Sequence, residues 1–307
     1  MMNTLSECVK EWMEKYKRNS VKPSTYDRLE TSYKALQKYP IAEMDILNIK
    51  AEDIQNFVNQ MVEEGYALST IKKQFLLVCA FLKFANTEGL IPRPIYNSVK
   101  LPAQSAVKKK KREIECYTQA EQIALVKVLR TRERIGYGAA ILMLEAGLRV
   151  GEALALTWSD VQWGRRAINI NKTLIRMAHK RRMEVQDSAK SFTSNRIVPL
   201  SKMAYEMLET MYKDVNDPYG YIFADEYGHP ISYEAIRYQV RKACKEANVP
   251  YKGQHVFRHT FATNCYNRGA DVKLLSKLLG HCEVSITFNT YIHLFGDALE
   301  ELRSVVG

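Results

Sequence analysis

A proline-containing and strongly basic segment near residue 100 divides this chain and restricts it to folds with two separate units. Pro92, Pro94 and Pro102 interrupt any helix or strand there, and five consecutive cations follow at 108–112. Proline cannot donate a backbone hydrogen bond, and adjacent like charges favour an extended chain. We therefore predict a first domain at residues 1–103, an interdomain linker at 104–114 and a second domain at 115–307.

Both domains are expected to be mainly helical. In the first, apolar residues recur at helical spacing over 54–61 and 71–85, and a further helix is expected from Pro23 to about Leu36, which suits a small bundle. The second is expected to contain helices at about 118–129, 135–145, 201–214 and 232–247 and strands at 167–170, 173–175 and 196–200. Thr118-Gln119-Ala120-Glu121 matches a capping box ahead of the first of these helices, and a later helix from Leu274 is expected to end at Gly280. The predicted fold class is mainly α, with one small antiparallel β-sheet in the second domain.

Composition argues against several classes of protein. No apolar run approaches the roughly 20 residues that a membrane-spanning helix requires, and the N-terminus lacks the basic and apolar regions of a signal peptide. The six cysteines are scattered without any Cys-x-x-Cys pair, which indicates reduced thiols and not a disulfide framework or a zinc ribbon. We expect a cytoplasmic protein.

Several cations, two histidines and one tyrosine in the second domain are suited to chemistry on a phosphodiester. Together they could surround a phosphate with guanidiniums, imidazoles and an ammonium, and direct a phenol at the phosphorus. These candidate residues are Arg149, Lys190, His255, Arg258, His281 and Tyr291. No cysteine set or carboxylate cluster suited to a metal accompanies them, so no metal and no cofactor is expected.

Two further residues are expected to support this set. Arg149 is expected in the first turn of a helix that begins after Gly147. Glu152 follows it by three residues and could hold its guanidinium, although such pairs are usually surface salt bridges. His255 and His259 have the spacing of a zinc-binding pair, but Val256 stands where the zinc motif has glutamate, so we favour a structural role for His259.

The order of the motifs in this domain resembles the tyrosine recombinase, or phage integrase, family. The resemblance is carried by Ala146-Gly147-Leu148-Arg149-x-x-Glu152, Lys190 ahead of Ser194-x-Arg196-Ile197-Val198-Pro199-Leu200, His255-x-x-Arg258-His259, Leu278-Leu279-Gly280-His281 and Tyr291. It covers the whole second domain, and the helical first domain resembles the core-binding domain of that family. The spacing from His281 to Tyr291 is similar to that of integrases from mobile elements.

The resemblance implies a role for each residue. Arg149 and Arg258 would hold the non-bridging oxygens of the scissile phosphate, and His281 would hydrogen-bond it. Tyr291 would be the nucleophile that forms a covalent 3′-phosphotyrosine, with His255 transferring its proton. Lys190 would protonate the departing 5′-oxygen, although three other cations (Lys180, Arg181 and Arg182) lie in the same hairpin region.

The charge of the chain agrees with a nucleic-acid partner. The net charge is +11, and residues 104–114 carry five basic residues against one acidic residue. A basic run is most often a solvated tether, but between two DNA-binding domains it could lie along the phosphates. The linker residues expected to contact DNA are Lys108, Lys109, Lys110, Lys111 and Arg112. The resemblance implies a homotetramer on two double-stranded recombination sites, and it allows for an accessory directionality factor.

Two other functions fit parts of this pattern. A type IB-like topoisomerase shares the phosphotyrosine chemistry but relaxes supercoils as a monomer; the N-terminal bundle, the linker and the Leu-Gly-His motif favour a recombinase. A catalytically idle DNA-binding regulator on the same scaffold is the second alternative. The complete set of candidate residues argues against the regulator, since a decayed enzyme is expected to have lost at least one of them.

Overall fold

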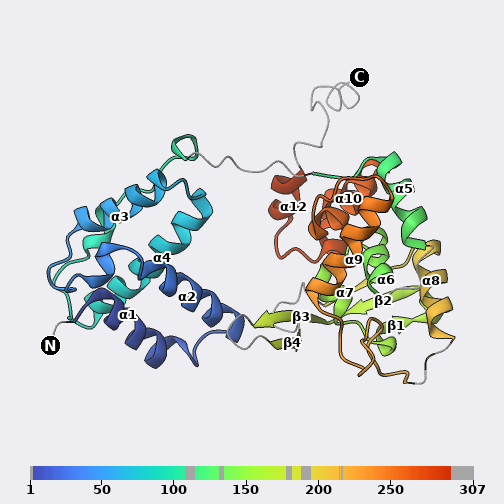
Figure 1. Cartoon of the computed structure of the whole chain (residues 1–307), viewed down its shortest axis with the longest axis horizontal. Helices are drawn as coiled ribbons and strands as arrows, with labels where there is room; N and C mark the ends of the chain where they lie inside the picture. Colours follow the sequence, from blue (N-terminus) through green and yellow to red (C-terminus); the bar gives the residue numbers. More distant parts are fainter. Residues whose placement is uncertain are drawn as a thin grey trace. The chain divides into compact units, whose positions relative to one another are not determined.

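The chain forms two compact units, drawn in Figure 1 with colours that follow the sequence. One unit comprises Met1–Glu113 with Arg176–Arg182, and the other comprises Ile114–Ile175 with Met183–Gly307. The structure, a computed structural model, describes residues 3–107, 115–130, 135–177, 182–187, 195–213, 215 and 217–291. The cations predicted to contact DNA at 108–112, and Lys190, lie outside the described residues.

The first unit is a helical bundle around one apolar core. Its helices are α1 (Leu5–Trp12), the π-helix η1 (Met13–Lys17), α2 (Pro23–Leu36), α3 (Ala51–Glu63) and α4 (Leu68–Thr87). Apolar residues three and four positions apart on α3 and α4, such as Ile54, Phe57 and Val58, are buried. The predicted helix at 23–36 and the predicted helical stripes at 54–61 and 71–85 are confirmed.

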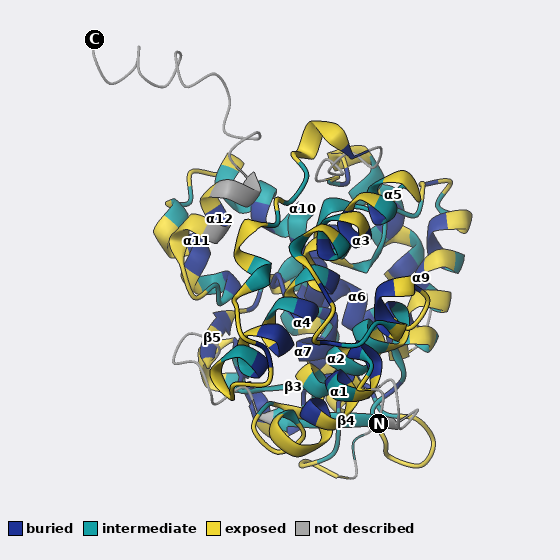
Figure 2. Cartoon of the chain, turned by 90° about the vertical axis from the view of Figure 1, so that its left-hand side faces the viewer, coloured by how far each residue is buried: buried dark blue, intermediate teal, exposed yellow. Residues whose placement is uncertain are grey.

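The second unit is built around α6 (Ile135–Glu145). Gly136 and residues 138–144 of this helix are buried, and the helix packs against its neighbours on several sides, because its small residues allow close approach. Figure 2 shows α6 in dark blue, the colour of buried residues. The helices around it are α5 (Gln119–Arg130), α7 (Val150–Leu154), α8 (Lys202–Tyr212), α9 (Tyr233–Glu246) and α10 (Gln254–Asn267).

The described residues form two small sheets, where the sequence predicted one. β1 (Val161–Gln162), β2 (Ala167–Ile170) and β5 (Arg196–Pro199) form an antiparallel sheet in that order, with β2 in the middle. β3 (Lys172–Met177) pairs instead with β4 (Arg182–Asp187). β4 was not predicted, because its two apolar residues, Met183 and Val185, stand in a short run of charged and polar residues.

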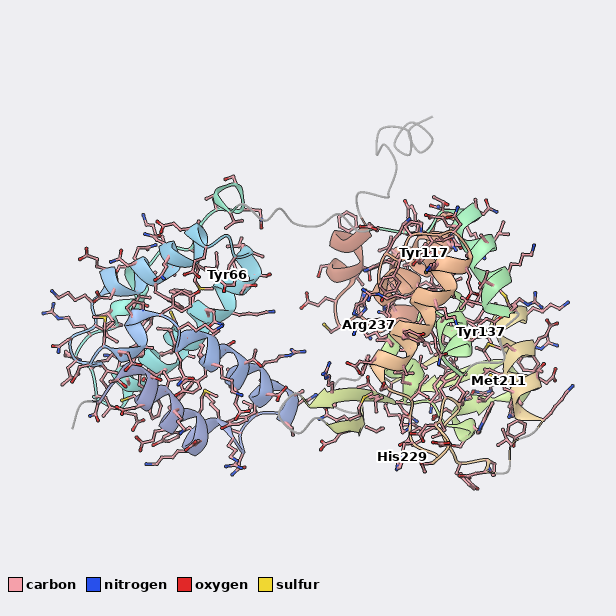
Figure 3. All side chains as sticks on the ribbon, viewed as in Figure 1. Tyr66, Tyr117, Tyr137, Met211, His229 and Arg237 are labelled. Carbon is pink, nitrogen blue, oxygen red and sulfur yellow. The ribbon has the colours of Figure 1, made fainter. Side chains whose placement is uncertain are left out.

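Local hydrogen bonds fix the ends of the elements that carry the candidate site. Thr118 and Glu121 exchange side-chain and backbone bonds ahead of α5, which confirms the predicted capping box. Tyr117, labelled in Figure 3, donates its backbone N–H to Thr260 on α10 at 2.9 Å and packs edge-on against Phe257.

The last helices described are α11 (Val272–Leu279) and α12 (Val284–Tyr291). None of the helices in the described ranges is both long and apolar enough to cross a membrane.

Candidate phosphate-binding site

Arg149 lies at the start of α7, and Gly147 forms the turn that separates α7 from α6. Gly147 has a positive φ of 65°, and a side chain there would meet the ring of Phe261. Arg149 was predicted in the first turn of the helix, but it is the N-cap residue, with extended backbone. Its backbone N–H and its Nη1 donate to the two carboxylate oxygens of Glu152 at 2.9 and 2.7 Å. The predicted pairing of Arg149 with Glu152 is present.

Glu152 is the buried centre of the site and not a surface ion pair. Its residue is 6% exposed, and its carboxylate contacts three arginines: Arg149 at 2.7 Å, Arg196 at 2.7 Å and Arg258 at 3.9 Å. Burial by itself raises the pKa of this carboxyl group, but the hydrogen bonds and charge of Arg196, followed by the charges of Arg149 and Arg258, lower it to about 2. Glu152 is therefore ionised at neutral pH.

Arg196 is a central member of the site that sequence reasoning did not single out. It lies on β5, is 9% exposed, and donates Nη1 and Nη2 to the two oxygens of Glu152 at 3.1 and 2.7 Å. Its Nε donates to the carbonyl of Leu278 at 2.6 Å. Its role as the main partner of Glu152 becomes visible only in the structure, which shows that its permanent charge is buried. The one sign of this role in the sequence is its place in the Arg-Ile-Val-Pro-Leu motif.

Arg258 on α10 is buried and joins three segments of the chain. Nη1 donates to the carbonyl of Gly147 at 2.8 Å, and Nη2 donates to the carbonyl of Leu279 at 2.6 Å. Nη2 also lies 3.0 Å from Nε2 of His281. Arg149 reaches the same helix end, because its Nη2 donates to the carbonyl of Gly280 at 3.3 Å. The two arginines predicted to act together are thus brought together at the C-terminus of α11.

Both candidate histidines lie in the field of these arginines. Desolvation, followed by the charges of Arg258 and Arg149, lowers the pKa of His255, although part of this residue is exposed to solvent. The same causes, with a smaller contribution from Arg196, lower the pKa of His281 to about 4. Both imidazoles are therefore neutral near pH 7 in the protein without DNA.

The remaining predicted residues are placed less completely. Tyr291 is the last residue of α12, and its side chain lies outside what the structure describes. His259 is half-buried in α10, one residue after Arg258. The described ranges contain no group of three or more His, Cys, Asp or Glu side chains that could hold a metal ion.

This arrangement is suited to binding a tetrahedral oxyanion. Arg149, Arg196 and Arg258 surround a single carboxylate, so positive charge exceeds negative charge among these residues. Guanidinium groups present planar, permanently charged donors that match phosphate oxygens. The side chain of Arg149 is 40% exposed, so a ligand from solvent can reach it. The geometry therefore favours a phosphate ligand between Arg149 and the pair formed by Arg258 and His281.

A second basic feature, which the sequence analysis did not identify, lies on α9. Arg237, Arg241 and Lys245 follow one another at intervals of four residues, and all three are exposed. Such spacing puts them on one face of the helix. Figure 3 labels Arg237 on this helix, and the guanidinium of Arg241 lies 5.0 Å from the ring centre of Tyr251. A row of cations along one face of a helix is suited to binding a polyanion such as a nucleic acid.

Comparison with protein families gives matches in both units. The model described as "Phage integrase family" matches residues 117–297, which is more than half of the chain. The model described as "Phage integrase, N-terminal SAM-like domain" matches residues 4–62, within the helical first unit.

Individual relatives and solved structures agree with these matches. A "Tyrosine recombinase XerC-like" protein from Caldanaerobacter subterraneus subsp. tengcongensis is 27% identical over 95% of this chain and 79% of its own length. The Tn1549 transposon integrase in complex with transposon right end DNA has a similar fold, with a TM-score of 0.81, 21% identity, and coverage of 99% of this chain and 100% of that one. A lambda integrase tetramer bound to a Holliday junction matches with a TM-score of 0.64, 18% identity, and coverage of 92% and 77%.

Proposed function

This chain belongs to the phage integrase family, and on that basis we propose that it is a site-specific DNA recombinase. It cleaves and rejoins DNA strands through a covalent 3′-phosphotyrosine intermediate. The observation that carries the proposal is the meeting of Arg149 and Arg258 at the carbonyls of Leu279 and Gly280, directly before His281. Two arginines from distant helices, with an imidazole beside them, form a binding place for one phosphate.

Arg149 and Arg258 bind the two non-bridging oxygens of the scissile phosphate. Negative charge on these oxygens grows as the phosphorus becomes five-coordinate, so fixed cations stabilise the transition state more than the ground state. Arg196 neutralises Glu152 from the buried side. The carboxylate can then orient Arg149 without cancelling the charge that the phosphate requires.

Tyr291 supplies the nucleophile. Its phenolic oxygen forms a bond to phosphorus while the bond from phosphorus to the 5′-oxygen breaks, and His255, neutral at pH 7, accepts the phenolic proton. Lys190 donates a proton to the departing 5′-oxygen. The phosphotyrosine conserves the energy of the phosphodiester, so a 5′-hydroxyl from another strand can reverse the same steps without ATP.

The partner is double-stranded DNA, and the enzyme acts as a multimer. We propose a homotetramer on two recombination sites, which is supported by the fold shared with the lambda integrase tetramer. The first unit is the core-binding domain, and the linker cations Lys108–Arg112 contact the DNA backbone. An accessory directionality factor would set the direction of the reaction. The enzyme would work in a prokaryotic cytoplasm, associated with the nucleoid when bound to DNA.

A covalent-trapping experiment tests this function. Nicked suicide duplexes tiled across the DNA that flanks the coding sequence are incubated with the protein in EDTA, and adducts that resist denaturation are counted. We expect an adduct with the wild type and none with Tyr291→Phe. Tyr227→Phe, which alters a tyrosine that is 76% exposed, serves as the matched control and should retain the adduct.

Three results would contradict the proposal. An adduct that persists in Tyr291→Phe would place the nucleophile elsewhere. Relaxation of a supercoiled plasmid without any recombinant product would favour a type IB-like topoisomerase. Binding to these duplexes without any adduct would favour an idle DNA-binding regulator.

A further inference from the structure

Thr287 is a buried residue that contacts the candidate site from the helix that carries the nucleophile. It lies on α12, has no exposed surface, and its Oγ1 is 2.7 Å from Nδ1 of His281. The other ring nitrogen, Nε2, is 3.0 Å from Nη2 of Arg258. His281 is thus held between a hydroxyl on α12 and a guanidinium on α10.

These two contacts determine which ring nitrogen of His281 carries the proton. A guanidinium can only donate hydrogen bonds, so Nε2 must accept from Arg258. A neutral imidazole that accepts at Nε2 bears its hydrogen on Nδ1. The hydroxyl of Thr287 is therefore the acceptor of the Nδ1–H bond.

We propose that Thr287 is a positioning residue for strand cleavage, which holds the imidazole of His281 with Nε2 directed at Arg258 and at the bound phosphate. The inference rests on the proposed recombinase function. Thr287 touches neither the phosphate nor the reacting atoms, and it acts through His281.

The hydroxyl suits both protonation states of the ring. The charged groups around His281 are Arg258, Arg149 and Arg196, which favour the neutral ring, and Glu152, which opposes them. A bound phosphodiester adds negative charge, which raises the pKa of His281 and favours a proton on Nε2. Nδ1 carries a hydrogen before and after that change, so Thr287 accepts throughout. The ring can donate to the phosphate without turning over.

The same bond connects the phosphate site to the nucleophile. Tyr291 follows Thr287 by four residues, about one turn of α12. The bond from His281 to Thr287 therefore ties the turn that precedes the nucleophile to the histidine beside Arg258. Loss of the hydroxyl should weaken cleavage more than it weakens DNA binding.

Two substitutions separate the hydroxyl from the shape of the side chain. Thr287→Val keeps the branched shape but removes the acceptor, and Thr287→Ser keeps the hydroxyl. Thr210→Val, an exposed threonine on α8 whose hydroxyl bonds to the carbonyl of Glu206, is the matched control for removing a helical threonine hydroxyl. Cleavage is measured as the rate of adduct formation on the nicked suicide duplex, and DNA binding is measured on the same duplex.

We expect Thr287→Val to cleave at least about tenfold more slowly, the effect of leaving one buried donor without its acceptor, while DNA binding changes less than about twofold. Thr287→Ser should stay within about threefold of the wild type, since it retains the hydroxyl acceptor. Thr210→Val should match the wild type.

The tautomer provides a readout that a purely structural role would not move. Nitrogen-15 correlation spectra of the full chain at neutral pH should show His281, assigned with His281→Asn, protonated on Nδ1 in the wild type and in Thr287→Ser. The population of this tautomer should fall in Thr287→Val. A wild-type ring protonated on Nε2 would overturn the proposal. So would an unchanged tautomer in a slow Thr287→Val variant, full cleavage by that variant, or a loss in Thr287→Ser as large as that in Thr287→Val.

Failure of this inference and failure of the proposed function have different signatures. If the wild type forms no adduct, or if Tyr291→Phe forms one, the proposed recombinase mechanism is wrong. The proposed role of Thr287 in cleavage is then wrong as well. If the wild type cleaves through Tyr291 but the Thr287 variants give one of the contradicting results described above, only the positioning role of Thr287 fails. Should Thr287→Val not fold, the tautomer of the wild type and the activity of Thr287→Ser still decide the question.

Discussion

The guanidinium of Arg196 holds both carboxylate oxygens of Glu152, through bonds of 3.1 and 2.7 Å between two buried side chains. Removal of one partner from such a pair leaves the other with its full desolvation cost and without its strongest bond. Arg196 also holds the carbonyl of Leu278 at the end of α11. The pair therefore links β5, α7 and α11 beneath the residues proposed to bind phosphate.

Arg196→Met should lower the free energy of unfolding of the second unit by about 3–5 kcal/mol, the usual cost of breaking a buried ion pair. Urea unfolding is the measurement. Lys202→Met is the matched control, because Lys202 pairs with Glu206 at 3.8 Å in an exposed position. It should leave the midpoint unchanged. Equal shifts for the two variants would show that Arg196 is not a structural support.

The low pKa of Glu152 predicts a loss of stability in acid. Its pKa of about 2 in the folded protein lies below the ordinary value of 4.5, so the unfolded chain binds the proton more tightly. The stabilisation is complete above about pH 4.5 and disappears as the pH falls towards 2, and its size is about 3 kcal/mol. Urea midpoints between pH 5 and pH 2 measure it. Glu152→Gln should have a flatter dependence, and an unchanged slope would contradict the assignment.

Gly280→Ala should lower stability and slow cleavage by more than the strain of a positive φ alone would explain. Gly280 has a φ of +64°, and a Cβ there would lie 2.9 Å from Nη1 of Arg196. Gly269 has a φ of +85° with no atom within 4 Å of such a Cβ, so Gly269→Ala has only the backbone strain of about 1 kcal/mol. Unfolding free energies and cleavage rates of the two variants are compared. Gly280→Ala should be worse in both measurements, and equal behaviour would refute the close packing on Arg196.

The row of cations on α9 should contribute to DNA affinity. Replacement of Arg237, Arg241 and Lys245 with alanine should reduce the slope of log affinity against log salt by about one for each phosphate that the variant no longer neutralises. Titrations of a labelled duplex at several salt concentrations give the slope. The control variant replaces Lys202 and Lys213, the exposed cations at the two ends of α8, and should keep the wild-type slope.

The linker cations should act in the same way if they contact DNA. Replacement of Lys108–Lys111 with glutamine should flatten the salt dependence of binding while leaving the rate of adduct formation at saturating DNA nearly unchanged. A slope equal to that of the wild type would indicate that this segment is only a tether.

Much of the architecture followed from local patterns. The helix from Pro23 to Leu36, the capping box of Thr118 with Glu121, and the glycine stop at Gly280 depend on nearest neighbours along the chain, and each is present. The order of the motifs predicted the family correctly. Arg149 was predicted in the first turn of its helix but is the N-cap residue, because a cap and the first turn differ in backbone angles, which the motif does not encode.

The sequence by itself determined the mainly helical fold class, the family and the residue types available for phosphate chemistry, because periodicity and motif order are properties of a one-dimensional chain. The tertiary structure alone decided that Glu152 is a buried hub, that Arg196 is its main partner, and that Thr287 meets His281. These relations depend on burial and on contacts between distant segments. Burial makes a carboxylate require its arginines, and the contact with a guanidinium, which can only donate, decides which nitrogen of the His281 imidazole bears a proton.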